Sequence, residues 1–152
     1  MVGVLVRTEI DASPAMVWEV VRHIGDHVDW MEDAVGIRFT SARTSGVGTT
    51  FDCETRLGPI ELTDRMEITE WEERQVIGVR HTGVVTGSGR FTLVERPDGG
   101  TVFSWDETLR LPWWLGGVVG EVPAAWILRR VWRRNLANLA ALTAQTGARG
   151  RS

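Results

Sequence analysis

The sequence of 152 residues contains no lysine and no tyrosine, and Cys53 is its only cysteine. All seventeen basic residues are arginines. Without lysine the chain cannot form a Schiff base with a carbonyl compound, and without tyrosine it has no phenol to act as a catalytic acid. A single cysteine cannot form a disulfide within the chain. The sequence therefore excludes lysine-dependent and tyrosine-dependent catalysis and a disulfide-stabilised scaffold.

The chain also lacks a long apolar run and an excess of positive charge. No apolar stretch approaches the roughly 20 residues of a membrane span, and the longest candidate is interrupted by Pro112, Glu121 and Pro123. The formal net charge of −3 argues against nucleic-acid binding through bulk electrostatics. No signal-peptide pattern is present, so we expect a cytoplasmic protein. The length predicts one domain, residues 1–146, and a disordered tail at 147–152.

Local patterns divide the chain into an early helical part, a series of strands and a late helix. Residues 4–10 alternate as a strand does. Ser13 and Pro14 predict the start of a helix that Gly25 ends, and a second, brief helix is expected near residues 26–31. These signals predict a strand followed by two short helices.

Two longer patterns follow. Between residues 34 and 111 apolar positions recur with period two, and short Gly or Pro turns separate the runs. This pattern predicts an antiparallel meander of six strands. Residues 121–144 have helical periodicity, and at 1.5 Å per residue a helix of this length spans roughly 36 Å, enough to cross a sheet.

This order of elements and several short stretches resemble the helix-grip superfamily. The stretches are IDASPAMVWEVV, DWM, GVGTTF, LTDRMEITEWEERQVIGVRHTG and RRVWRRNLANL. The superfamily includes START lipid-transfer domains, birch-pollen-allergen-like proteins, coenzyme Q-binding proteins and bacterial polyketide cyclases. The resemblance implies an α+β fold in which a seven-stranded curved antiparallel sheet wraps around the long C-terminal helix. It also implies two short helices after the first strand and a cavity between sheet and helix.

The phase of each strand and the inward stripe of the last helix indicate which side chains would face that cavity. The expected cavity residues are Phe51, Cys53, Met66, Val79, Phe91, Phe103, Trp105, Leu128, Val131, Trp132 and Asn135. This largely apolar set is typical of a small-molecule site. Trp113, Trp114 and Leu115 are expected either to form a gate over the cavity or a membrane contact, or to plug the core at the end of the sheet.

Three ionisable residues, Asp64, His81 and Glu107, share the strand faces that carry the apolar side chains. An unpaired charge on such a face is costly, so these residues need partners or water. They could act as general acids and bases on a bound carbonyl compound, with His81 carrying the proton near neutral pH. The alternative places them at the cavity rim, wetted or paired with arginines such as Arg90 and Arg110.

No cofactor and no metal are expected. His23 and His27 are four residues apart, a spacing that some zinc sites use. Gly25 lies between them, however, and no third ligand is evident in the sequence.

Three functions remain open from the sequence. The first is binding of a hydrophobic small molecule such as a lipid, an isoprenoid or a polyketide-like compound. The second is an aromatase/cyclase-dehydratase activity, in which Glu107 or His81 removes an acidic proton and an aldol-type ring closure follows. The third is a protein-partner role for the outer Arg/Trp face of the last helix. Contact with a membrane surface and a homodimer are further options, whereas nucleic acid is not an expected partner.

Overall fold

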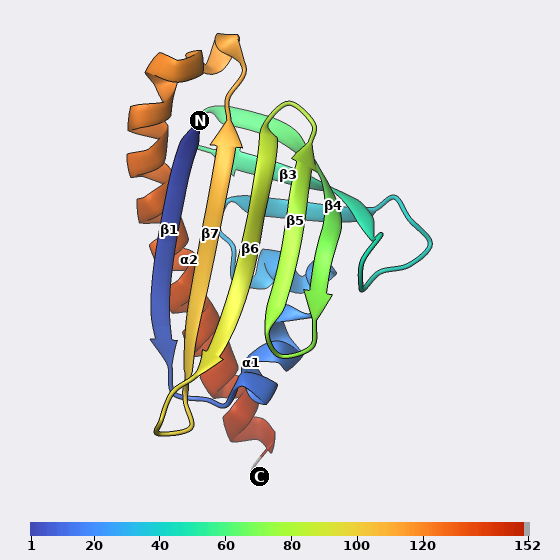
Figure 1. Ribbon diagram of the computed structural model, residues 1–152, viewed down its shortest axis with the longest axis vertical. Coiled ribbons are helices and arrows are strands. Elements are labelled where there is room, and N and C mark those ends of the chain that lie inside the picture. The colour runs from blue at the N-terminus through green and yellow to red at the C-terminus, as the bar shows by residue number, and fades with distance from the viewer. Residues whose placement is uncertain (151–152) are drawn as a thin grey trace.

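Seven strands form one antiparallel sheet, and a long helix lies across it (Figure 1). The computed structural model describes residues 1–150; residues 151 and 152, at the end of the expected tail, lie outside the described part. The strands are β1 (Val2–Ile10), β2 (Ala34–Phe39), β3 (Thr50–Leu57), β4 (Ile60–Glu72), β5 (Val76–Thr82), β6 (Thr86–Glu95) and β7 (Thr101–Arg110). The helices are α1 (Pro14–Val21), η1 (Ile24–Asp29), η2 (Trp113–Leu115) and α2 (Gly117–Gly150).

The strand order in the sheet is β1-β7-β6-β5-β4-β3-β2. Strands β2 to β7 follow one another as hairpins, and β1 pairs with β7 at the far edge. Register shifts interrupt the pairing near Gly36 in β2 and between Ile68 and Glu70 in β4. Such bulges bend and twist a sheet, which suits a sheet that curves around a helix. The structure confirms the expected helix-grip fold.

The two short helices after β1 cover one end of the concave face. The backbone N–H of Met16 donates to Ser13 Oγ (3.3 Å), so Ser13 caps α1 as its sequence position predicts. Trp18 of α1 is buried in the core, beside the buried Leu136 and Leu139 of α2. Side chains from α1 and α2 thus fill this part of the core.

Helix α2 is longer than expected. It begins at Gly117 and continues through Gly150, so the predicted helix of residues 121–144 is too short at both ends. A Cβ atom on Gly147 would lie 2.5 Å from Met16 Cε, which shows how closely the end of α2 approaches α1. Residues 147–150, which the sequence assigns to a disordered tail, are the last four residues of this helix. No helix in residues 1–150 is long and apolar enough to span a membrane.

Candidate functional site

A cavity of about 570 Å³ lies between the concave face of the sheet and α2. Its walls come from strands β2 to β7, from η1 and the segment before β2, from η2 and from α2. Nine of the eleven side chains that strand phase and the helix stripe predicted do line it: Phe51, Cys53, Met66, Val79, Phe91, Trp105, Leu128, Val131 and Trp132. Alternation along a strand sends every second side chain to this face, which explains why the pattern could be read from sequence.

Phe103 and Asn135 are the two expected cavity residues that do not line it. Phe103 is fully buried, and its ring packs against that of Phe91 with centroids 5.3 Å apart. It faces inward as predicted, but it belongs to the filled part of the core. Asn135 is also fully buried. Its side-chain oxygen accepts a hydrogen bond from residue 32, and its side-chain nitrogen donates one to residue 33. The prediction that Asn135 lies on the inward stripe of α2 is correct, and its side chain holds the loop just before β2.

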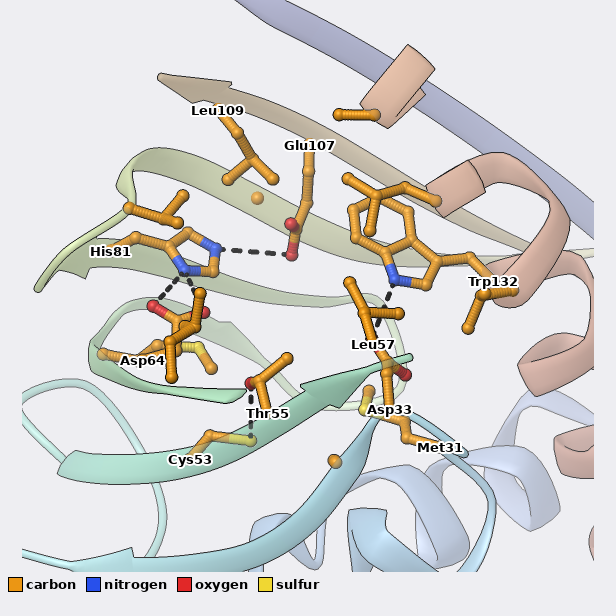
Figure 2. A pocket seen from close by; sticks show the side chains of 18 of the residues that line it. Met31, Asp33, Cys53, Thr55, Leu57, Asp64, His81, Glu107, Leu109 and Trp132 are labelled. Carbon is orange, nitrogen blue, oxygen red and sulfur yellow. Dashed lines mark hydrogen bonds and ion pairs between the residues drawn. The ribbon is translucent and has the colours of Figure 1, made fainter. Parts of the chain in front are cut away.

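That loop contains Asp33, a cavity residue that the sequence did not indicate. Trp132 Nε1 donates to Asp33 Oδ2 (3.2 Å), as Figure 2 shows. Asn135 Nδ2 donates to Asp33 Oδ1 (2.7 Å). The backbone N–H of Glu32 donates in turn to Asn135 Oδ1 (2.9 Å). We call these hydrogen bonds the Asp33 clasp. Loop residues have no periodicity, so no sequence pattern could have placed Asp33 against α2.

The three ionisable residues Asp64, His81 and Glu107 come together on the wall of the cavity (Figure 2). His81 Nδ1 donates to Asp64, with 2.9 and 3.0 Å to the two carboxylate oxygens. His81 Nε2 lies 3.4 Å from Glu107 Oε1 and makes no hydrogen bond within the described residues. The imidazole thus lies between two carboxylates, and its Nε2 faces Glu107 in a long ion pair.

The alternative placement of these groups at a wet rim, paired with arginines, is wrong. His81 and Glu107 are both buried, and Asp64 is mostly buried. Arg90 instead pairs with Glu70 on the outer face of the sheet at 2.8 Å, and Arg110 is exposed. The partner of each carboxylate is therefore the histidine.

A glycine makes this arrangement sterically feasible. Gly89 in β6 pairs with Glu107 in β7 on one side and with Val79 in β5 on the other. A Cβ atom on Gly89 would lie 2.3 Å from Glu107 Cγ and 2.6 Å from Oε1. Glu107 therefore lies across β6 in the space that a side chain would fill, and so reaches His81 of β5.

Burial and the two carboxylates shift the pKa of His81 in opposite directions. Burial lowers the pKa of the imidazole, but the interactions with Asp64 and Glu107 outweigh it and raise the pKa to about 10. His81 is therefore an imidazolium at neutral pH. In this state both ring nitrogens carry protons and act as donors.

A second histidine, His27, also lines the cavity but is neutral. Burial lowers its pKa to about 4, and its Nε2 lies 2.7 Å from the carbonyl oxygen of Val21. Because one ring nitrogen bonds this backbone oxygen, His27 of η1 is held by the last residue of α1. Within residues 1–150 no group of three or more metal-ligating side chains is close enough to hold a metal ion.

Cys53 contributes a non-reactive surface to the cavity. Burial raises the pKa of its thiol to about 12, so the nucleophilic thiolate is absent at neutral pH. Trp105 and Trp132 form a flat wall nearby, since their rings stack with centroids 4.4 Å apart at an interplanar angle of 13°. The cavity therefore offers broad apolar surfaces and one charged cluster.

The segment after β7 divides into exposed and cavity-lining residues. Trp113 is 87% exposed and Trp114 is 53% exposed, so the prediction that they plug the core is wrong. Leu115 turns inward and lines the cavity. The sequence could not separate these directions, because a helix of three residues is too short to show a periodic pattern.

The sequence matches one known protein family over almost its whole length. A family model described as "Polyketide cyclase / dehydrase and lipid transport" matches residues 1–144. The chain belongs to this family. Among curated proteins, none matches the sequence. The family assignment supports a role in binding a hydrophobic ligand.

Solved structures show the same fold at low sequence identity. TTHA0849 from Thermus thermophilus has a TM-score of 0.80 and 13% identity, covering 95% of this chain and 98% of that one. A START superfamily protein from Mycobacterium smegmatis has a TM-score of 0.76 and 13% identity over the same shares of both chains. XoxI from Bacillus cereus has a TM-score of 0.75 and 14% identity, covering 97% and 99%. These similarities support the fold alone.

Proposed function

We propose that the protein binds a hydrophobic small molecule, such as a lipid, an isoprenoid or a polyketide-like compound, in the cavity between sheet and α2. The observation that carries the proposal is the mainly apolar cavity of about 570 Å³ with one buried charged cluster. This volume lies within the range of small-molecule sites. Apolar contact supplies most of the binding free energy, at roughly 25 cal/mol for each Å² removed from water.

The charged cluster gives the ligand its orientation. His81 Nε2 can donate to a carbonyl or hydroxyl oxygen, and Glu107 can accept from a hydroxyl group. The stacked pair Trp105 and Trp132 offers a flat surface to a ring. The preferred ligand is therefore mostly apolar, with an oxygen substituent at the end that meets β5 and β7.

Native mass spectrometry of freshly purified protein, followed by organic extraction, tests this proposal. We expect a discrete lipophilic adduct on the wild-type protein. Val79→Trp places a large side chain in the cavity and should remove the adduct, whereas Val94→Trp, at an exposed position on β6, should retain it. An adduct that survives Val79→Trp in a folded protein would show that the ligand binds elsewhere.

The charged cluster also favours a second candidate, a cyclase-dehydratase. With His81 already protonated, Glu107 is the base and His81 the acid. Glu107 takes a proton from a carbon between two carbonyls, and that carbon then attacks a second carbonyl. His81 donates its Nε2 proton to the oxygen of this second carbonyl, which becomes a hydroxyl group. The attack closes the ring, and loss of this hydroxyl with a neighbouring proton then releases one water and leaves a carbon–carbon double bond in the ring.

The starting protonation states of Glu107 and His81 can then be restored within the site. After the first step Glu107 carries the proton, and after the second His81 Nε2 lacks one. The distance of 3.4 Å between Glu107 Oε1 and His81 Nε2 is short enough for this proton to return with little motion. Asp64 remains bound to Nδ1 throughout and fixes the orientation of the ring.

Substitution separates binding from catalysis. For an enzyme, Glu107→Gln should lower turnover of a poly-ketone substrate by about 10²–10⁴-fold, with ligand affinity nearly unchanged. His81→Ala should also lower turnover. Glu67→Gln, on the outer face of β4, serves as the control and should keep full activity. Equal turnover in Glu107→Gln and wild type would overturn the cyclase candidate and leave the binding proposal intact.

A further inference from the structure

Exposed apolar side chains cover the end of the molecule where η2 meets α2. We call this group the apolar tip, and its members are Trp113, Trp114, Val118, Val119, Val122 and Trp126. Val118 and Val122 are each 77% exposed, and Val119 is 85% exposed. Contiguous apolar surface of this kind marks an interaction site on a water-facing protein.

The geometry of α2 gathers these side chains on one face. At 100° per residue, Val118, Val119 and Val122 fall within about 100° of one another in the first turns of α2. Pro123 follows them in the helix, and Trp126 is the next exposed large apolar residue after it. Arg130 and Arg133 continue the same face further along the helix, with Arg130 Cζ 5.9 Å from the Trp126 ring centroid. Figure 1 shows η2 and the first turns of α2 extending past the end of the sheet, so the apolar tip lies at one end of the molecule.

Charge is distributed very unevenly along the chain. Residues 111–152 contain six arginines and one acidic residue, Glu121, for a formal charge of +5. Residues 1–110 contain eleven arginines and nineteen acidic residues, for a formal charge of −8. Glu121 is buried, so the described surface of the segment from 111 onward exposes no carboxylate. The apolar tip is therefore continuous with a basic surface on an otherwise acidic molecule.

We propose that the apolar tip docks on a membrane surface that contains anionic lipids. Arg130 and Arg133 follow Val122 by eight and eleven residues, or about 12 and 16 Å along the helix. A tip buried about 5–10 Å in the acyl boundary places these arginines beside the lipid phosphates. Trp126 then lies between the two levels, in the interfacial zone that tryptophan prefers.

The cavity opens close to this surface. Leu115, Pro123 and Ile127 come from the same segment and line the cavity. Ile127 is also 44% exposed, so the cavity reaches the molecular surface at its side chain. A docked protein would therefore place the opening of its cavity next to the bilayer, where an apolar ligand could pass without crossing water.

Vesicle co-sedimentation of the full chain tests the docking without any ligand, so its result is independent of the proposed binding function. The vesicles contain either phosphatidylcholine alone or equal parts of phosphatidylcholine and phosphatidylglycerol. We expect binding to the mixed vesicles and weaker binding to the neutral ones. Trp113→Ala should lower the partition coefficient at least about tenfold, since a largely exposed tryptophan loses its apolar contact with lipid.

The paired variant Arg130→Gln with Arg133→Gln tests the charge contribution at exposed positions. It should lower the partition coefficient on mixed vesicles by about fivefold for each arginine. Arg7→Gln with Arg74→Gln removes the same charge from exposed sites on β1 and the β4–β5 turn and should change binding little. Equal losses in both pairs, or no binding to mixed vesicles, would overturn the proposal. So would a wild-type dimer that Trp113→Ala converts to a monomer, because the tip would then be covered by a second copy.

Discussion

His27 and His81 are both buried and both line the cavity, yet their pKa values move in opposite directions. His27 lies among aromatic rings, with its Nε2 against one backbone carbonyl, and burial keeps it neutral. His81 lies between two carboxylates that overcome the same effect. The comparison shows that burial alone does not decide the charge of a histidine. Its immediate partners do, so two similar residues give the cavity one neutral and one cationic group.

The two histidines also affect stability at opposite ends of the pH scale. The pKa of His27 is lowered on folding, so its contribution is complete above about 6.5 and is lost as the pH falls toward 4. The pKa of His81 is raised on folding, so its contribution is complete below about 6.5 and is lost as the pH rises through about 10. Between them, the two shifts favour the folded state most near pH 6.5.

Removing the two carboxylates should make His81 resemble His27. In Asp64→Asn with Glu107→Gln, burial is no longer opposed, and we expect the pKa of His81 to fall from about 10 to below its ordinary 6.5. NMR titration of the imidazole Cε1 proton measures this value directly. Glu67→Gln with Glu70→Gln, on the outer face of β4, is the matched control and should leave the pKa of His81 near 10. A pKa that stays high in the first variant would show that another group holds the charge.

The second prediction isolates His27. In His27→Gln a non-titrating amide can donate to the carbonyl of Val21, so the pH-dependent contribution of the imidazole disappears. Relative to this variant, wild type should lose about 3 kcal/mol of unfolding free energy between pH 7 and pH 4. Urea denaturation at several pH values measures the difference. His23→Gln is the control, and parallel curves for wild type and His27→Gln would contradict the assignment.

The smallest effect is expected from a single methyl group. In Gly89→Ala the new Cβ collides with Glu107 and should displace its carboxylate from His81, which lowers the pKa of His81 by about one unit. Gly3→Ala in β1 is the control, because a Cβ atom there meets nothing within 4 Å. NMR titration distinguishes displacement of Glu107 from simple loss of stability. An unchanged pKa would mean that β6 shifts to accommodate the methyl group.

The sequence was sufficient to predict the fold and the inward faces of the strands. Glu107 alternates with aromatic residues in β7, and this pattern placed a carboxylate on the inward face of the strand. The contact with His81 could not be predicted in the same way, because β5 and β7 are separated by β6. It depends on the missing side chain of Gly89 in the intervening strand.

Other features were missed because regular periodicity ends where helices and strands do. Asn135 lies on the inward stripe of α2 as predicted, but its partner Asp33 belongs to a loop. Trp113 is exposed and Leu115 is directed inward, although both belong to one short apolar stretch. Periodicity determines the directions of side chains within elements, and tertiary contacts determine those between elements.

The Asp33 clasp has a kinetic consequence. The sheet is open, with β1 and β2 at its two edges, and the clasp joins α2 to the loop just before β2. A ligand that passes between that loop and α2 must wait until these hydrogen bonds have separated. The lifetime of the clasp would then limit exchange by that route, whereas exchange beside Ile127 would not depend on it.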